Sequence, residues 1–337
     1  MINILYAGSP DVSAIPLERL IAESVTPGAQ FRIAGVLTNP PAAQGRSKAL
    51  VPTPVAQEAE RAESRYGITV PVFTPEKLGA QAREQIAAVH PDLLVCFAYG
   101  KIFGPKFMAL FPYGGINLHP SLLPAYRGCA PVPAAILDCK AETGITVQKL
   151  AAQMDSGNIL LQRIIPLSGT ETAGALLESA ARAGAEMLLE IITGAAKNRA
   201  IPEGIPQNDA DATYSAMLKK EDGLIDWHDT ARAIDAKIRA FNPWPGAFTR
   251  VRGVQLKIHR AAVYGGELPQ QAREALDRGA IPGTVLGVDK KEGILIQTGN
   301  GILTAATLQW QTKKAVDWKD FINGSGDFPG TICGTQE

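Results

Sequence analysis

The sequence lacks several features that would place it in a specialised class of protein. No apolar run is long enough to cross a bilayer, and Met1-Ile2-Asn3-Ile4 begins an apolar stretch without the basic residues of a signal peptide. Cys96, Cys129, Cys139 and Cys333 form no C-x-x-C pair, which indicates reduced thiols of a cytosolic protein. The net charge is zero, so indiscriminate nucleic-acid binding is not expected, and any RNA partner must meet a local patch. We expect a cytoplasmic protein with no membrane partner.

The sequence also has little of what a metal centre or a dinucleotide site requires. His90, His228 and His259 lie outside any motif, and we interpret them as structural. No third His or Cys has ligand spacing, so no metal site is predicted. Gly8-Ser9-Pro10 follows the first predicted strand with one glycine where G-x-G-x-x-G would stand, and proline has no N–H to offer a phosphate. The pattern argues against a dehydrogenase.

The first part of the chain alternates strand and helix signals. At 337 residues and 46% hydrophobic composition the chain is long enough for two domains with full cores. Continuously apolar strands separated by helical segments are typical of a parallel sheet with helices on both faces, an α/β, Rossmann-like domain. Strands are expected at 2–7, 33–37, 70–73, 92–97 and 115–118, and helices at 11–22, 54–66, 81–89, around 107 and at 172–192.

The texture of the sequence changes after the helix predicted to end near residue 192. Pro202, Gly204 and Pro206 mark a linker. We therefore assign 1–205 to the α/β domain, 206–214 to the linker and 215–330 to a second domain. Short strands separated by turns predict a small antiparallel β-barrel there, with the oligonucleotide-binding (OB-like) type as the natural candidate. They are expected at 247–250, 254–262, 284–287, 293–297 and 302–308.

One stretch carries residues suited to acyl chemistry. Asn117 and His119 stand two apart at the end of an apolar strand, so they share a face. A carboxamide can donate to an oxyanion and an imidazole can move a proton near neutral pH. An isolated Asn-x-His is more often a polar turn with a satisfied histidine, and Asp155, in Asp-Ser-Gly, alone reads as an Asx-turn or helix cap. The surrounding pattern decides between these readings.

That pattern resembles the folate-dependent formyltransferases. The chain has Asn117-Leu118-His119, then Ser-Leu-Leu-Pro-Ala-Tyr-Arg-Gly ending at Gly128, and Asp155 lies 36 residues after His119. The resemblance implies that 10-formyltetrahydrofolate donates the formyl group, as a co-substrate, with no metal. It implies three catalytic residues, Asn117, His119 and Asp155. The folate would lie against Phe97, Ala98, Tyr99, Ser121, Leu122, Leu123 and Pro124.

The resemblance also gives each catalytic residue a role. Asn117 and His119 would donate to the oxygen of the tetrahedral intermediate, and protonated His119 would supply a proton to the leaving nitrogen. Asp155 would orient the imidazole, favour its charged form and help remove the proton from the attacking amine. Arg127 is expected to order the loop.

The second half of the chain resembles the methionyl-tRNA formyltransferase family. The resemblance rests on Ile225-Asp226-Trp227, the Asn-Pro-Trp-Pro-Gly segment at 242–246, and Gly299-Asn300-Gly301. It implies an initiator methionyl-tRNA as acceptor. Residues 238–266 contain no Asp or Glu, which is what a phosphate-contacting surface requires. A solvated cationic face is the alternative, but arginine dominates this segment and its planar fork suits phosphate, which favours RNA. The candidate tRNA contacts are Arg46, Lys48, Lys219, Lys220, Arg239, Arg250, Arg252 and Lys257.

Two departures from the family and two other functions stay in view. The loop at 39–49 holds fewer basic residues than is usual in the family. The chain also has Met217-Leu218-Lys219-Lys220-Glu221 where the family often has Lys-Leu-x-Lys-Glu, so one expected lysine is missing. A UDP-amino-sugar N-formyltransferase would share both domains. A non-catalytic RNA-binding protein with an idle formyltransferase domain would not need Asn117, His119 and Asp155 intact. We expect a monomer.

Overall fold

The computed structural model describes residues 1–43 and 49–334, which form two compact units. Among the described residues, the first unit comprises 1–43, 49–131, 142–166 and 177–215, and the second comprises 132–141, 167–176 and 216–334. The first unit overlaps the domain predicted at 1–205, but it omits 132–141 and 167–176 and includes 206–215. No helix in the described part of the chain combines the length and the apolar character that a bilayer span needs.

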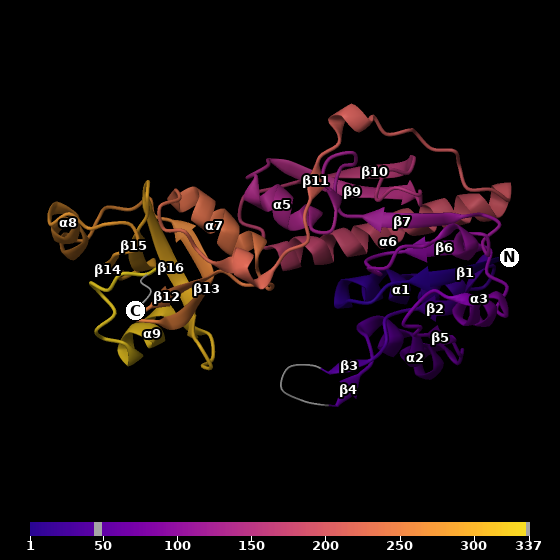
Figure 1. Ribbon diagram of the computed structural model, residues 1–337, viewed down its shortest axis with the longest axis horizontal. Coiled ribbons are helices and arrows are strands. Elements are labelled where there is room, and N and C mark those ends of the chain that lie inside the picture. Colours follow the sequence, from indigo (N-terminus) through magenta and orange to yellow (C-terminus); the bar gives the residue numbers. More distant parts are fainter. Residues whose placement is uncertain (44–48, 335–337) are drawn as a thin grey trace. The chain divides into compact units, whose positions relative to one another are not determined.

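The first unit is built on a seven-stranded sheet (Figure 1). Five neighbouring strands run parallel, and two antiparallel strands extend the sheet at one edge. In sheet order the strands are β10 (Ile159–Pro166), β9 (Glu142–Lys149), β7 (Gly115–His119), β6 (Leu93–Cys96), β1 (Ile2–Ala7), β2 (Phe31–Leu37) and β5 (Val72–Phe73). Its helices are α1 (Asp11–Ser24), α2 (Pro54–Tyr66), α3 (Ala80–Ala87), α4 (Pro105–Met108) and α6 (Ala173–Asn198), of which 173–176 belong to the second unit. Residues 132–137 of α5 (Pro131–Leu137) also belong to the second unit.

Both faces of this sheet are covered, as the apolar strands predict. Ile4 and Tyr6 of β1 lie in one core cluster with side chains of α1, α2 and α6, whereas Leu5 and Ala7 lie in another with side chains of α3 and α4. Alternate residues of β1 therefore pack into two cores, which is why every residue of the strand except the half-buried Asn3 is buried. The fold class predicted for this part of the chain is confirmed.

The two antiparallel edge strands were not predicted. β9 carries Thr143, Thr146 and Gln148 among its apolar residues, and β10 is exposed at several positions, so neither has the continuous apolar run that marked the parallel strands. The long helix also continues to Asn198, six residues beyond its predicted end at 192. Three small residues, Gly194, Ala195 and Ala196, read as the start of a loop but continue the helix.

The segment predicted as a linker at 206–214 has regular structure. It contains a 3₁₀ turn, η1 (Asp209–Asp211), and leads into β11 (Tyr214–Ser215). β11 pairs in parallel with β8 (Arg127–Gly128), at the end of the loop at 120–128, which we call the signature loop. Two further short strands, β3 (Ala42–Ala43) and β4 (Leu50–Val51), pair on either side of residues 44–48.

The second unit contains a curled antiparallel sheet around its own apolar core. Buried Leu256, Ile258, Ile294, Ile296 and Leu303 form its centre. The predicted strands are all present, which confirms a small β module of half-barrel form. Its strands are β12 (Phe248–Val251), β13 (Val254–Val263), β16 (Ile302–Trp310), β15 (Gly293–Gln297) and β14 (Val285–Asp289), with β17 (Val316–Asp317) beside β16. The helical segments are η2 (Lys220–Gly223), α7 (Ala231–Ala240), α8 (Gln270–Asp277) and α9 (Trp318–Gly324).

Candidate functional site

The candidate site lies where β7 ends. Ile116 and Leu118 of β7 point into the core shared with α1 and α6, so Asn117 and His119 point to the opposite face, as predicted. β6 and β1 run parallel to β7, and in such sheets ligands bind at the carboxyl ends of the strands. The Asn117 side chain is half-buried and His119 is buried.

His119 and Asp155 are brought together by the fold. The Nδ1 atom of His119 lies 3.6 Å from Oδ1 of Asp155, with side-chain exposures of 5% and 12%. The Nε2 atom lies 2.9 Å from the carbonyl oxygen of Tyr126. A carbonyl only accepts hydrogen bonds, so Nε2 carries a proton and Nδ1 is the nitrogen that gains or loses one. The nitrogen that can gain a proton therefore faces the carboxylate.

Burial sets the charge state of His119. Desolvation lowers the pKa of His119 below its ordinary value, and the Asp155 charge and the Tyr126 hydrogen bond oppose this only in part. The resting imidazole is therefore neutral at pH 7. The sequence predicts that Asp155 favours the charged ring, because it shows the carboxylate partner but does not show how completely the ring is buried.

The Asp155 carboxylate is held from two sides. Its Oδ1 accepts a hydrogen bond from Nε2 of Gln148 at 2.9 Å, and its Oδ2 accepts one from the Gly128 N–H at 2.8 Å. Gln148 pairs with Asn117 across the β7–β9 ladder, so the two side chains share a face of the sheet. Gly128 has φ +105°, and a Cβ there would lie 2.4 Å from the Ser215 oxygen. Only glycine fits this position.

The signature loop is fixed by side chains of β9 and β10. Thr146 donates to the Ser121 oxygen at 2.7 Å and accepts from the Leu123 N–H at 3.2 Å. Gln162 donates to the Leu123 oxygen at 2.7 Å and to the Thr146 hydroxyl at 2.9 Å. The loop therefore depends on two strands that follow it in the chain.

The predicted folate residues are close to the carboxyl ends of β6 and β7, but several side chains point elsewhere. Phe97, Tyr99 and Leu123 are buried, with Phe97 and Tyr99 in the two cores. Ser121 is also buried and donates to the Ala125 oxygen. Ala98 is exposed, and Leu122 and Pro124 are half-buried. Core packing, the simpler reading for Phe97, is the one observed.

The predicted tRNA contacts differ in how free their charges are. Lys219, Lys220 and Arg250 are exposed. Lys257 is half-buried, with Nζ 3.5 Å from the Pro245 oxygen. Arg239 is 14% exposed and is paired with Asp235 at 2.8 Å, so it is poorly placed for a phosphate. Arg46 and Lys48 lie outside the described residues.

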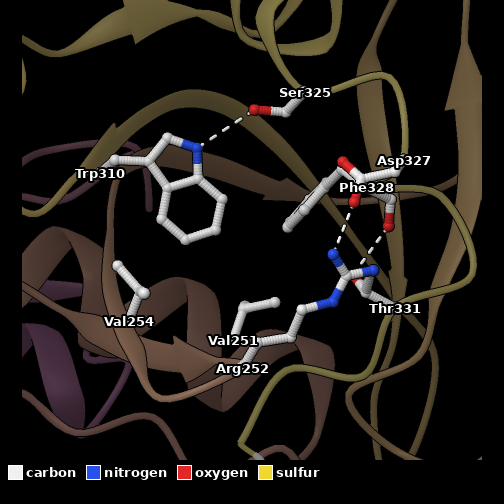
Figure 2. A pocket seen from close by; sticks show the side chains of 8 residues that line it. All are labelled: Val251, Arg252, Val254, Trp310, Ser325, Asp327, Phe328 and Thr331. Atoms are coloured by element: carbon white, nitrogen blue, oxygen red, sulfur yellow. Dashed lines mark hydrogen bonds and ion pairs between the residues drawn. The ribbon is translucent and has the colours of Figure 1, made fainter.

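Arg252 is exposed but paired, and it borders a small cavity. Its guanidinium lies 2.5 Å from Asp327 (Figure 2). The cavity of about 190 Å³ is lined by Val251, Arg252, Val254, Trp310, Ser325, Asp327, Phe328 and Thr331. Ligand sites usually span about 300–1,000 Å³. Trp310 donates to Ser325 and Arg252 binds Asp327, so the polar groups satisfy each other and do not mark a ligand site.

Sequence reasoning missed three residues of the site. They are Gln148 and Gln207, which contact Asp155 by their side chains, and Tyr126, which fixes the His119 ring. No metal-binding cluster of His, Cys, Asp or Glu occurs among residues 1–43 and 49–334. The pairing of β7 with β9 could have revealed Gln148 had β9 been recognised.

Two family models cover most of the chain. The formyl transferase model matches residues 4–192, and the formyl transferase C-terminal domain model matches residues 217–326. The methionyl-tRNA formyltransferase of Treponema denticola is 48% identical over 328 residues, which is 97% of this chain and 98% of that protein.

Two solved structures share the fold. HypX of Aquifex aeolicus in complex with tetrahydrofolic acid has a TM-score of 0.60 at 15% identity, covering 96% of this chain and 47% of HypX. The chain thus spans about half the length of HypX. The methionyl-tRNA formyltransferase of Clostridium thermocellum has a TM-score of 0.53 at 18% identity, over 79% of this chain and 96% of that one. The chain belongs to the formyl transferase family, among its methionyl-tRNA formyltransferases.

Proposed function

We propose that the chain transfers the formyl group of 10-formyltetrahydrofolate to the α-amino group of methionine esterified to initiator tRNA, in the cytoplasm and as a monomer. The observation that carries the proposal is the convergence of Asn117, His119 and Asp155 at the end of β7, with His119 Nδ1 3.6 Å from Asp155. A carboxamide that can bind an oxyanion, together with an imidazole beside a carboxylate, suits acyl transfer to an amine.

The reaction exchanges one carbon–nitrogen bond for another. The neutral α-amine, with an unperturbed pKa of about 8, attacks the formyl carbon. The carbonyl oxygen becomes negative, and Asn117 donates a hydrogen bond to it. The bond from carbon to the leaving nitrogen then breaks, and the proton lost by the amine ends on that nitrogen. The chain must therefore carry one proton between two nitrogens.

His119 is the group suited to carry that proton. In the resting state its Nε2–H is engaged with Tyr126 and its Nδ1 is free to accept. When Nδ1 takes the amine proton, the ring becomes positive beside the Asp155 carboxylate, which stabilises that charge. The imidazolium can then donate to the oxyanion and to the leaving nitrogen. The lowered pKa of His119 favours prompt release of the proton.

We infer the folate and tRNA contacts from which of the predicted residues have exposed or half-buried side chains. Ala98, Leu122 and Pro124 would contact the folate directly, while Phe97, Tyr99, Ser121 and Leu123 would contribute backbone groups. Lys219, Lys220, Arg250 and Lys257 would meet tRNA phosphates. Arg46 and Lys48 stay candidates from the sequence, and Arg46→Ala should mainly weaken the use of tRNA.

The test is a comparison of acceptors. The protein is incubated with 10-formyltetrahydrofolate and one of methionyl initiator tRNA, a UDP-amino sugar or glycinamide ribonucleotide. N-acetylmethionyl initiator tRNA is the matched control, because its α-amine is blocked. We expect formylation of the methionyl-tRNA alone. Formylation of the sugar alone would overturn the proposed acceptor, and no transfer to any of the three would point to an idle domain.

A further inference from the structure

Asp155 has a backbone conformation that needs outside support. Its φ is +54°, in the left-handed region that few non-glycine residues adopt. The next residues are equally constrained, because a Cβ on Gly157 would lie 1.8 Å from the Lys149 oxygen. A segment in this conformation keeps its place only when neighbouring groups hold it.

Gln207 supplies that support from far along the chain. Its Nε2 donates to the Asp155 carbonyl oxygen at 2.8 Å and to the Gly157 carbonyl oxygen at 2.7 Å. A longer contact of 3.3 Å reaches Oε1 of Gln148, the residue that binds the Asp155 carboxylate. One amide group thus links the backbone of the Asp155 turn to the side chain that orients its carboxylate.

Arg127 fixes the orientation of the Gln207 amide. Nε and Nη2 of Arg127 donate to Gln207 Oε1 at 3.0 and 2.8 Å, so the amide nitrogen must face the Asp155 turn. Arg127 is 2% exposed and also binds Asp209 at 2.8 Å and the Tyr214 hydroxyl at 3.2 Å. The guanidinium is therefore occupied by this segment, which leaves it little freedom to reach a substrate.

We propose that Gln207 is a positioning residue that holds the Asp155 carboxylate beside Nδ1 of His119. This inference rests on the proposed function, in which Asp155 stabilises the charged imidazole. It assigns to the 206–214 segment a part in the reaction that a linker would not have. Loss of the Gln207 donors should let the Asp155 turn relax, so that the carboxylate moves away from the imidazole.

The experiment compares Gln207→Leu and Gln207→Glu with Asn208→Ala. The leucine removes both donors, and the glutamate keeps the size and the Arg127 contact while placing an oxygen opposite two carbonyl oxygens. Asn208 is exposed and binds only the adjacent turn residues Ala210 and Asp211 in the described structure. Single-turnover formylation should slow by about 100-fold in both Gln207 variants, a size typical of misplaced catalytic groups, and stay unchanged in Asn208→Ala.

Two further readouts separate positioning from a general loss of structure. Removal of the carboxylate from the imidazole should lower the pKa of His119 further in Gln207→Leu, as followed by NMR titration without any substrate. In a protein that already carries Asp155→Asn, adding Gln207→Leu should slow formylation only slightly further, because both substitutions act through the Asp155 carboxylate. An unchanged His119 titration, or equal rate losses in the two backgrounds, would overturn the inference. Failure of the wild-type protein to formylate methionyl-tRNA would instead defeat the proposed function, and the titration would still decide the role of Gln207.

Discussion

At the scale of single residues, His119 combines deep burial with a carboxylate neighbour. Burial keeps the resting ring neutral, and Asp155 at 3.6 Å limits the cost of charging it. A proton carrier needs both properties, because a ring that charges too easily would not release the proton and an isolated buried ring would not accept it.

The lowered pKa of His119 predicts how stability depends on pH. The unfolded chain binds a proton at this residue near its ordinary pKa of about 6.5, whereas the folded chain does so only at lower pH. The free energy of unfolding should therefore fall as pH drops below that value, by at most about 1.4 kcal/mol per pH unit for this one proton.

Urea unfolding at several pH values between neutrality and mild acid measures this effect. As pH falls, the free energy of unfolding should decrease less in His119→Gln than in the wild type, because glutamine does not titrate. Equal pH dependence in the two proteins would contradict the neutral resting state.

Asn117 gives a second prediction at this scale. Asn117→Ala removes the donor assigned to the oxyanion, and losing one such donor typically lowers kcat by about 100- to 1,000-fold. The side chain is half-buried at a strand end, so folding should be little affected. Steady-state formylation together with circular dichroism tests both statements, and a variant with near wild-type kcat would remove Asn117 from the mechanism.

The sequence points to Asn117, His119 and Asp155, whereas it does not point to the residues that hold them in place. Asn117 and His119 are two apart on one strand, so their shared face follows from the strand period. Gln207 reaches Asp155 from 52 residues away, through a segment whose composition reads as a linker. No local pattern reports such a contact.

At the scale of elements, the antiparallel strands β9 and β10 organise the site as much as β7 does. The register places Gln148 opposite Asn117 and Thr146 opposite His119. Gln162 of β10 in turn pairs with Thr146. A row of polar side chains thus runs across three strands and fixes the signature loop.

Thr146→Val tests this arrangement. Valine has nearly the same shape but cannot bind the Ser121 oxygen, the Leu123 N–H or Gln162. Leaving buried polar groups without partners should lower the free energy of unfolding by about 1–3 kcal/mol. Chemical denaturation measures this, and the conservative Thr146→Ser should recover most of the loss. A fully stable valine variant would show that Thr146 does not secure the loop.

The elements also show where sequence patterns are informative. The parallel strands are buried on both faces, so apolar runs revealed β1, β2 and β6. β9 and β10 mix polar and apolar residues for two reasons. Their polar side chains hold the signature loop, and β10 is an exposed edge strand of the sheet. Their function hides them from a search for hydrophobic periodicity.

At the scale of the whole molecule, a net charge of zero conceals an uneven distribution. Residues 238–266 have five basic and no acidic side chains. Two of the basic residues are nevertheless paired with acids outside this stretch, Arg239 with Asp235 and Arg252 with Asp327. The charges available to a phosphate backbone are therefore fewer than the sequence indicates. Lys219, Lys220 and Arg250 remain exposed.

The difference between exposed and ion-paired basic residues predicts distinct effects on the salt dependence of tRNA binding. Each lost phosphate contact lowers the slope of log K against log salt by about 1, so Lys219→Ala with Lys220→Ala should lower it measurably. Arg239→Gln should leave the slope unchanged, because Asp235 already neutralises that arginine. Binding isotherms over a range of salt concentrations give the slopes. A lower slope for Arg239→Gln would show that its ion pair opens to meet RNA.

The most direct test of the mechanism is the single-turnover rate of formyl transfer from 10-formyltetrahydrofolate to methionyl initiator tRNA, compared between the wild type and His119→Ala. Loss of the proton carrier should slow the chemical step by about 100- to 10,000-fold while the protein stays folded and still binds folate. A His119→Ala protein that transfers the formyl group at a rate within a few-fold of the wild type would contradict the central role of this imidazole.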